Sequence, residues 1–171
     1  MIADSVILVG FMGAGKSSVG RLLAERLGRR FVETDDLIVA KEGMSIPEIF
    51  AEKGEPYFRS LEAEALELLK AKRGDVIATG GGFPCREGVM EALKDLGAVV
   101  WLSGDFDTLY RRGRSAGNRP MLDNRSKEEA RALYRAREPY YRGAHLTVDT
   151  TEGGVVDVVN RIQSWLNERR S

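Results

Sequence analysis

The sequence predicts an α/β fold in which a parallel sheet is flanked by helices. Short apolar runs rich in Val and Ile alternate with helical patterns along the whole chain, without repeats or low-complexity segments. The runs are continuously apolar, which is typical of parallel strands covered on both faces. We therefore expect a doubly wound open sheet, and ligands beyond the carboxyl ends of its strands. The predicted strands are 6–10, 30–34, 76–79, 99–102 and 146–149.

Helical patterns fill the segments between these runs. The last of them places Val155, Val158, Val159, Ile162, Trp165 and Leu166 on one stripe. We interpret Trp165 and this stripe as packing against the core, because the spacing is that of a docked helix. The predicted helices are 16–27, 46–51, 58–69, 87–96, 105–112, 126–141 and 155–166.

Length and composition predict one cytosolic domain that spans residues 1–171. The chain has 26 Lys plus Arg, 26 Asp plus Glu, one Cys and one His. A chain of this length supports its own core. One Cys cannot form an internal disulfide, and one His excludes a Cys/His zinc site. No apolar stretch approaches the ~18 residues of a membrane span, and the N-terminus lacks the basic region of a signal peptide.

The segment GFMGAGKSS at 10–18 is the strongest functional signal. It matches GxxxxGK[ST], directly after the first predicted strand and directly before the first predicted helix. Backbone amides of such a loop surround phosphate oxygens, and the helix N-terminus adds favourable partial charge. We expect Lys16 to reach the β- and γ-phosphates of a nucleotide and the Ser17 hydroxyl to ligate Mg²⁺. The other predicted nucleotide-binding residues of this loop are Gly13, Ala14, Gly15 and Ser18.

Two further strand ends carry candidate site residues. The second strand ends in FVETDD, so Glu33, Asp35 and Asp36 could hold waters of Mg²⁺ or accept a proton from a hydroxyl. The alternative is that Asp35 or Asp36 caps the next helix, and for Asp36 we favour it. The third strand runs into Gly80, Gly81 and Gly82. Three glycines indicate close approach by a ligand or another backbone, although a plain loop is the alternative.

Arg59, Arg119 and Arg137 are scattered along the chain, and each alone is typical of a solvated surface. Arg is the side chain best suited to bidentate contact with carboxylate or phosphate, so their convergence on one cleft would indicate an anionic acceptor. Residues 113–125 lack an apolar face, which predicts an exposed, mobile loop and a candidate lid. Cys85 and His145 are interpreted as residues outside the mechanism.

Taken together, these segments resemble the shikimate kinase family over nearly the full chain. The resemblance implies a nucleoside-monophosphate-kinase-like P-loop fold with a five-stranded parallel sheet, a shikimate-binding region at about 34–62 and the lid at about 113–125. It also implies a mostly monomeric enzyme that moves phosphate from ATP to the 3-hydroxyl of shikimate, with Mg²⁺, in aromatic amino-acid synthesis. The matching segments are GFMGAGKSSVGRLLAERLG, FVETDDLI, SIPEIFAEKGEPYFRSLE, ATGGG, RRGRSAGNRPML and REPYYRGA.

The resemblance assigns roles on the acceptor side. Asp35 is similar to the carboxylate that holds the shikimate hydroxyls and is the candidate base. Arg59 and Arg137 match the arginines that grip the shikimate carboxylate, Phe58 matches an aromatic wall, and the glycines at 80–82 line the same pocket.

On the nucleotide side, Arg119 matches the lid arginine that reaches the phosphates, and Arg112 resembles the arginine that packs on adenine. Glu33 is a departure, because the family usually has Asp there, acting on Mg²⁺ through water. The extra methylene puts the metal geometry in question more than the identity of the substrate.

Three other interpretations stay open at this point. The first is a kinase of the same fold for gluconate, a nucleoside monophosphate or an antibiotic hydroxyl. The second is a non-catalytic nucleotide-binding regulator, which Glu33 alone favours. The third is nucleic-acid binding, since residues 111–142 hold ten basic and four acidic side chains. That segment lacks an aromatic stacking motif and the chain is neutral overall, so we expect ATP and shikimate, and neither nucleic acid nor membrane, as partners.

Overall fold

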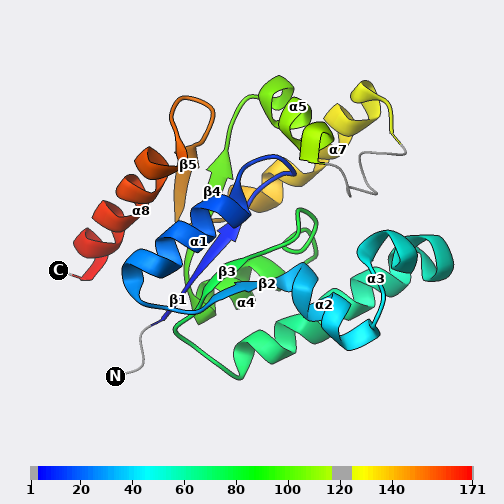
Figure 1. The fold of residues 1–171 in the computed structure, drawn as a ribbon, viewed down its shortest axis with the longest axis horizontal. Coiled ribbons are helices and arrows are strands. Elements are labelled where there is room, and N and C mark those ends of the chain that lie inside the picture. The colour runs from blue at the N-terminus through cyan, green and yellow to red at the C-terminus, as the bar shows by residue number, and fades with distance from the viewer. Residues whose placement is uncertain (1–3, 117–124, 171) are drawn as a thin grey trace.

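Five parallel strands form the centre of the molecule, with helices on both sides (Figure 1). The computed structural model describes residues 4–116 and 125–170. The strands are β1 (Ser5–Val9), β2 (Phe31–Glu33), β3 (Val76–Ala78), β4 (Gly97–Ser103) and β5 (Leu146–Asp149). Their order is β2-β3-β1-β4-β5, and every neighbouring pair is parallel, as the apolar runs predicted.

The burial of the strands follows their place in the sheet. Every residue of β1 and β3 is buried, whereas the edge strands β2 and β5 are partly exposed. Strand β4 is longer than the predicted 99–102 because Gly97 and Ala98 pair with Ser5 and Val6 of β1. Since β1 is the central strand, the loop that follows it opens at the middle of the sheet.

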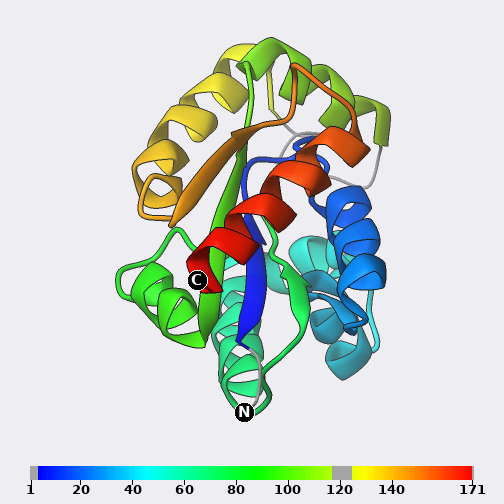
Figure 2. The ribbon, with the colours of Figure 1, turned by 90° about the vertical axis from the view of Figure 1, so that its left-hand side faces the viewer.

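Helices α1 and α8 pack together on one face of the sheet, and Figure 2 shows α8 crossing that face beside α1 with α3 behind the sheet. In the part of the chain that the structure describes, no helix is both long and apolar enough for a membrane span. The helices are α1 (Lys16–Leu27), α2 (Thr34–Glu42), α3 (Ile46–Lys70), α4 (Val89–Leu96), α5 (Phe106–Ala116), α7 (Lys127–Tyr141) and α8 (Val155–Arg170).

The helix prediction was incomplete around the second strand. Helix α2 was not among the predicted helices, because only Thr34 and Ile38 of it are buried and they form no extended apolar stripe. Helix α3 joins the predicted helices 46–51 and 58–69 across a kink at Gly54, whose φ of 83° is not helical. Pro56 follows this kink and begins the second helical half in the position that proline favours.

The predicted loop at 113–125 was wrong at its beginning. Helix α5 continues to Ala116, and Gly113 is buried because its backbone packs against the loop after β1. The remainder of the candidate lid, with Arg119, lies outside the described residues.

The apolar stripe of α8 packs against the core as predicted, with Val158, Val159, Ile162 and Leu166 buried. Val155 is an exception, since 39% of it is exposed at the start of the helix. Trp165 is half-buried against the core, and its ring centroid lies 6.4 Å from that of His145. The helix therefore contributes packing, and Trp165 faces away from the cleft described below.

His145 extends the pairing of β5 with β4 through its side chain. Its backbone N–H donates to the Val99 carbonyl at 2.9 Å, and its Nδ1 accepts from the Val99 N–H at 3.0 Å. Burial lowers the pKa of His145 below its ordinary 6.5, and the charges of Arg169 and Lys94 lower it further. The folded state therefore favours the neutral imidazole, which alone can accept this hydrogen bond.

We expect this imidazole to make the fold less stable in acid. Because the folded pKa is lowered, the stabilisation is present above pH 6.5 and is lost as pH falls through the folded pKa. In His145→Asn, an amide oxygen replaces Nδ1 without titrating. Urea unfolding at pH 7.5 and pH 5 is expected to show wild type losing about 1 kcal/mol more than the variant. Equal losses in both proteins would contradict this role.

Candidate active site

A cleft of about 710 Å³ opens at the carboxyl ends of β1, β2 and β3. This is where an open α/β sheet binds ligands. The structure brings nearly all predicted site residues to its wall; Arg119 alone lies outside the described residues. These lining residues are Gly13, Ala14, Gly15, Lys16, Ser17, Ser18, Glu33, Asp35, Phe58, Arg59, Gly80, Gly81, Gly82, Arg112 and Arg137.

The loop between β1 and α1 forms one side of the cleft. Gly13 and Gly15 both have φ of 85°, which an L side chain rarely adopts, and a Cβ on Gly13 would overlap the Leu109 carbonyl of α5. Gly15 is the N-cap of α1 and has no side chain that could cap the helix. The first backbone amides of α1 therefore have no side-chain acceptor at the N-cap. No acidic residue lies in that first turn. Such an N-terminus is a ready site for phosphate.

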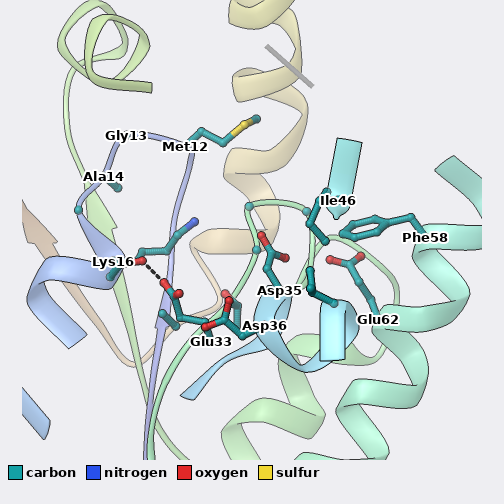
Figure 3. Close-up of a pocket in the computed structure, with 18 of the residues that line it drawn as sticks. Met12, Gly13, Ala14, Lys16, Glu33, Asp35, Asp36, Ile46, Phe58 and Glu62 are labelled. Carbon is teal, nitrogen blue, oxygen red and sulfur yellow. Dashed lines mark hydrogen bonds between the residues drawn. The ribbon is translucent and has the colours of Figure 1, made fainter. Parts of the chain in front are cut away.

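Lys16 and Ser17 occupy the first turn of α1. The Lys16 ammonium donates a hydrogen bond to the Gly10 carbonyl, and so folds back across the loop that precedes it. Figure 3 shows its amino end inside the cleft, on the side that faces Asp35. The Ser17 hydroxyl donates to Glu33 Oε1 at the end of β2. The loop after β1 is thereby joined to the acidic end of β2.

Glu33, Ser17 and Asp36 form a set of oxygen donors beside the phosphate loop. Burial raises the pKa of Asp36, and the charge of Glu33 and a hydrogen bond that protonated Asp36 donates to Glu33 raise that pKa further, while Arg21 opposes the shift. Oxygen donors of this kind suit Mg²⁺, which keeps several waters and substrate oxygens in its coordination shell. Among residues 4–116 and 125–170, no group of three or more His, Cys, Asp or Glu side chains could hold a metal ion. Such an ion would need oxygens from a nucleotide or water.

The interpretation of Asp36 as a helix cap was wrong. Helix α2 begins at Thr34 with Glu33 at the N-cap position, and Asp35 and Asp36 lie in its first turn. The Thr34 hydroxyl accepts a hydrogen bond from the Gly80 N–H at 3.0 Å, which holds the start of α2 against the glycine turn. Asp35 Oδ1 would lie 3.0 Å from a Cβ on Gly80. Asp35 is therefore held at the turn, across the cleft from the phosphate loop (Figure 3).

Arg59 reaches the glycine turn from α3. Its Nη1 donates to Glu62 Oε1 at 2.6 Å, and its Nη2 pairs with Glu55 Oε1 at 3.2 Å on the outer side. Its guanidinium also lies 5.3 Å from the ring centroid of Phe58, which is buried against Phe50. The guanidinium is thus held by a carboxylate, and Phe58 forms an apolar part of the cleft wall.

Arg137 reaches the same turn from α7. Only 5% of Arg137 is exposed, and its Nη1 is buried without a hydrogen-bond partner among the described residues. The Tyr141 hydroxyl, one helical turn further on, donates to the Gly81 carbonyl at 2.7 Å and holds α7 against the turn. A buried guanidinium with an unused donor is costly unless a ligand completes its contacts.

The two guanidiniums converge where the turn has no side chain. A Cβ on Gly82 would lie 2.6 Å from Arg59 Nη1 and 2.9 Å from Arg137 Nη2, and a Cβ on Gly81 would lie 2.9 Å from Arg137 Nη1. The groups that approach Gly81 and Gly82 most closely are therefore arginine side chains, whereas the prediction was a ligand or another backbone. Two guanidiniums side by side form a site for a carboxylate or phosphate group.

Arg112 borders the cleft from α5, on the side of the nucleotide loop. It is exposed, and its Nη1 donates to the Thr150 carbonyl at 3.3 Å, after β5. Arg112 therefore lines the cleft with its guanidinium tied to the segment after β5, and a planar guanidinium is suited to stacking on a base.

Glu62 and Cys85 also lie near the two arginines. Glu62 was missed, although a glutamate three residues after Arg59 inside an apolar helical stripe was a usable signal. Burial raises the pKa of the Cys85 thiol to about 11, so the thiolate is a minor species near neutral pH. Helix α4 begins at Val89, two residues after the start of the predicted helix 87–96.

Comparisons with known proteins agree with this geometry. The family model for shikimate kinase matches residues 12–167. A shikimate kinase of Geobacter metallireducens is 47% identical over 166 residues, which cover 96% of this chain and 93% of that protein. One of Symbiobacterium thermophilum is 46% identical over 169 residues, which cover 96% of this chain and 97% of that protein.

Solved structures give the same result. The structure of shikimate kinase from Acinetobacter baumannii in complex with shikimate superposes with a TM-score of 0.92 at 38% identity, and the match covers 98% of this chain and 94% of that one. The sequence match includes α1, α3 and α7, which carry the side chains on both sides of the cleft. The chain therefore belongs to the shikimate kinase family.

Proposed function

We propose that this protein transfers the γ-phosphoryl group of ATP to the 3-hydroxyl of shikimate, giving ADP and shikimate 3-phosphate in aromatic amino-acid synthesis. The observation that carries the proposal is the convergence of Arg59 and Arg137 on the turn at 80–82, in the same cleft as the phosphate loop. Shikimate is a compact polyol with one carboxylate. Gripping its carboxylate at the turn directs its hydroxyls toward the phosphate loop.

On the nucleotide side, the amides of the loop at 13–18 hold the phosphates, and Lys16 and Arg119 stabilise the charge that develops on the transferred group. Arg112 supports the adenine. Family membership and the geometry of the loop support these roles. The remainder of the proposed lid, which follows α5 after Ala116 and extends to about residue 125, closes over the nucleotide, excludes water and so suppresses hydrolysis of ATP without an acceptor.

On the acceptor side, Asp35 accepts hydrogen bonds from the shikimate hydroxyls and orients the attacking one, from which it takes the proton. Phe58 packs on the ring of the acceptor, and Gly80, Gly81 and Gly82 leave room for it. These residues belong to the region of about 34–62 and the turn, which we assign to shikimate binding within a single monomeric kinase domain. Catalysis is then mainly positioning and charge stabilisation.

Mg²⁺ is the cofactor that the donor set fits. The Ser17 hydroxyl would hold the ion directly, and Glu33 would hold it through water, with nucleotide oxygens completing the shell. When bound, Mg²⁺ neutralises phosphate charge. The residues of the chain contribute the fixed loop amides and the Ser17–Glu33 contact, which orients the hydroxyl before the nucleotide arrives.

The two arginine roles predict different kinetic effects. Arg119→Ala is expected to lower kcat roughly 100-fold with less effect on the shikimate KM, because it removes a contact made mainly to the transferring phosphoryl group. Arg59→Ala is expected to raise the shikimate KM roughly 30-fold with less effect on kcat. Steady-state kinetics measure both. Equal effects of each variant on the two constants would count against the assignment.

The direct test is ADP release by the purified protein with ATP and Mg²⁺. Shikimate alone is expected to stimulate release strongly, whereas gluconate, quinate and nucleoside monophosphates are not. Lys16→Met should abolish the stimulated rate and so exclude a contaminating kinase. Stimulation by another acceptor would refute the choice of substrate. ATP binding without stimulated release would favour the non-catalytic regulator.

A further inference from the structure

A cluster of charged side chains lies behind the glycine turn, and the proposed mechanism uses only part of it. Glu62 is fully buried. Its Oε1 accepts from Arg59, whereas its Oε2 has no hydrogen-bond partner among the described residues and would lie 3.4 Å from a Cβ on Gly80. Asp35 Oδ1 would lie 3.0 Å from the same Cβ. Figure 3 shows both carboxylates pointing toward this part of the cleft. A buried and a half-buried carboxylate beside the same glycine need nearby positive charge.

Arg86 supplies a further charge from the segment between the turn and α4. Its Nη1 donates to the Arg59 carbonyl at 3.3 Å. Its Nε and Nη2 are buried and have no hydrogen-bond partner in the described part of the chain. Arg86 is not among the described residues that line the cleft. Arg86 is therefore not placed to bind the nucleotide or the acceptor directly. Burying its charged nitrogens still costs free energy unless another interaction compensates.

The charges around the turn indicate what that interaction is. Arg59, Arg86 and Arg137 carry three positive charges, and Asp35 and Glu62 carry two negative charges when ionised. The cluster is then one positive charge in excess, which the carboxylate of a bound acceptor would balance. Without Arg86 the cluster would be neutral, and an anionic acceptor would leave it negative. Glu55 is outside this sum because 46% of its side chain is exposed and solvent screens it.

We propose that Arg86 is a positioning residue of the acceptor site that acts through Glu62. By its charge and its bond to the Arg59 carbonyl, it keeps Glu62 ionised and α3 in place, and Glu62 in turn holds the Arg59 guanidinium toward the acceptor. The acceptor is an anionic hydroxyl compound, so the inference rests on the proposed function.

The protonation of Glu62 is consistent with this role. Burial raises the pKa of Glu62 and Asp35 raises it further, while Arg59 and Arg86 lower it. The Cys85 thiol and the Tyr141 hydroxyl are also titratable groups near these charges, and burial raises the pKa of each, so both stay protonated near neutral pH. Loss of Arg86 would raise the pKa of Glu62, and a protonated Glu62 would no longer hold Arg59 as an ion pair. The defect should therefore grow as pH falls.

The first experiment measures kcat and the shikimate KM between pH 6 and pH 8.5 for Arg86→Met and Arg86→Lys. Arg86→Met is expected to raise KM about tenfold at pH 7, and more at pH 6, with kcat within about threefold of wild type. Arg86→Lys keeps the charge and should restore most of the affinity. Arg73→Met is the matched control, because Arg73 also donates to a backbone carbonyl, that of Leu96, away from the cleft. A pH-independent rise in KM would overturn the inference.

The second experiment tests the route through Glu62. In a Glu62→Gln background, Arg86→Met should change KM by less than about twofold, because the carboxylate on which it acts is gone. An additive effect would overturn the inference.

A third measurement does not depend on the substrate. Carboxyl-carbon NMR of the folded protein should show Glu62 titrating at higher pH in Arg86→Met than in wild type. An unchanged titration would overturn the inference whatever the acceptor. A shifted titration in a protein that shikimate does not stimulate would refute the proposed function and still support the electrostatic effect of Arg86 on Glu62.

Discussion

Asp35→Asn is expected to lower kcat about a thousandfold and to leave the KM for ATP nearly unchanged. Asn has the size of Asp, so the start of α2 should keep its contact with the glycine turn. It cannot accept a proton from the attacking hydroxyl at neutral pH. Asp35 is on the turn side of the cleft, across from the phosphate loop, so nucleotide binding should persist. Steady-state kinetics and direct titration with ADP measure the two effects separately.

Asp157→Asn is the matched control for Asp35. Asp157 is also an acidic residue in the first turn of a helix, but it lies on α8 and does not line the cleft. Its replacement tests for a general effect of losing one helix-terminal charge, and activity is expected to stay near that of wild type. If Asp35→Asn lowers kcat less than tenfold while raising the shikimate KM, Asp35 binds the acceptor without acting as its base.

The parts of the site that are local in sequence could be predicted well. The loop at 10–18 lies between a buried strand and a helix, and its glycines, Lys16 and Ser17 are neighbours in the chain. The sequence motif of this loop therefore determines nearly all of the geometry of the phosphate site. The central strands were predictable for a similar reason, because strands covered on both faces consist of continuous apolar residues.

The acceptor side could be predicted only through the resemblance to a family. Arg59 and Arg137 lie on α3 and α7, and only the packed fold brings both to Gly82. By sequence alone each arginine is typical of a surface residue, but only 5% of Arg137 is exposed in the structure. Local sequence does not determine which charged side chains the tertiary fold will bury.

Helix α2 and the buried Glu62 were not predicted from the sequence, for two different reasons. The short α2 is held by the bond between Thr34 and Gly80 and by packing on α3, and neither produces a periodic apolar stripe. Glu62 lies within the apolar face of α3, where a charge is normally evidence against burial. Its partner Arg59 lies three residues earlier on the same helix, so the pairing is local, whereas the burial of the pair depends on the tertiary fold.

Gly82→Ala is expected to raise the shikimate KM by roughly 30-fold, with kcat and the ATP KM changed much less. The new methyl group would lie 2.6 Å from Arg59 Nη1 and 2.9 Å from Arg137 Nη2, so both guanidiniums must move. They are the ends of flexible side chains, so they can move without a shift of the backbone, but the move disturbs the bond from Arg59 to the buried Glu62 and removes the grip on the carboxylate. Steady-state kinetics give both constants, and thermal unfolding should show a folded protein with a lowered midpoint.

A graded series separates this effect from a general disturbance. A Cβ on Gly81 would meet only one guanidinium nitrogen, Arg137 Nη1 at 2.9 Å, and a Cβ on Gly154 would meet nothing within 4 Å. The rise in shikimate KM should therefore be largest for Gly82→Ala, smaller for Gly81→Ala and absent for Gly154→Ala. If Gly82→Ala leaves KM at the wild-type value, the two arginines do not bind the acceptor carboxylate. If Gly82→Ala lowers kcat with KM unchanged, the turn positions the reacting hydroxyl instead of the carboxylate.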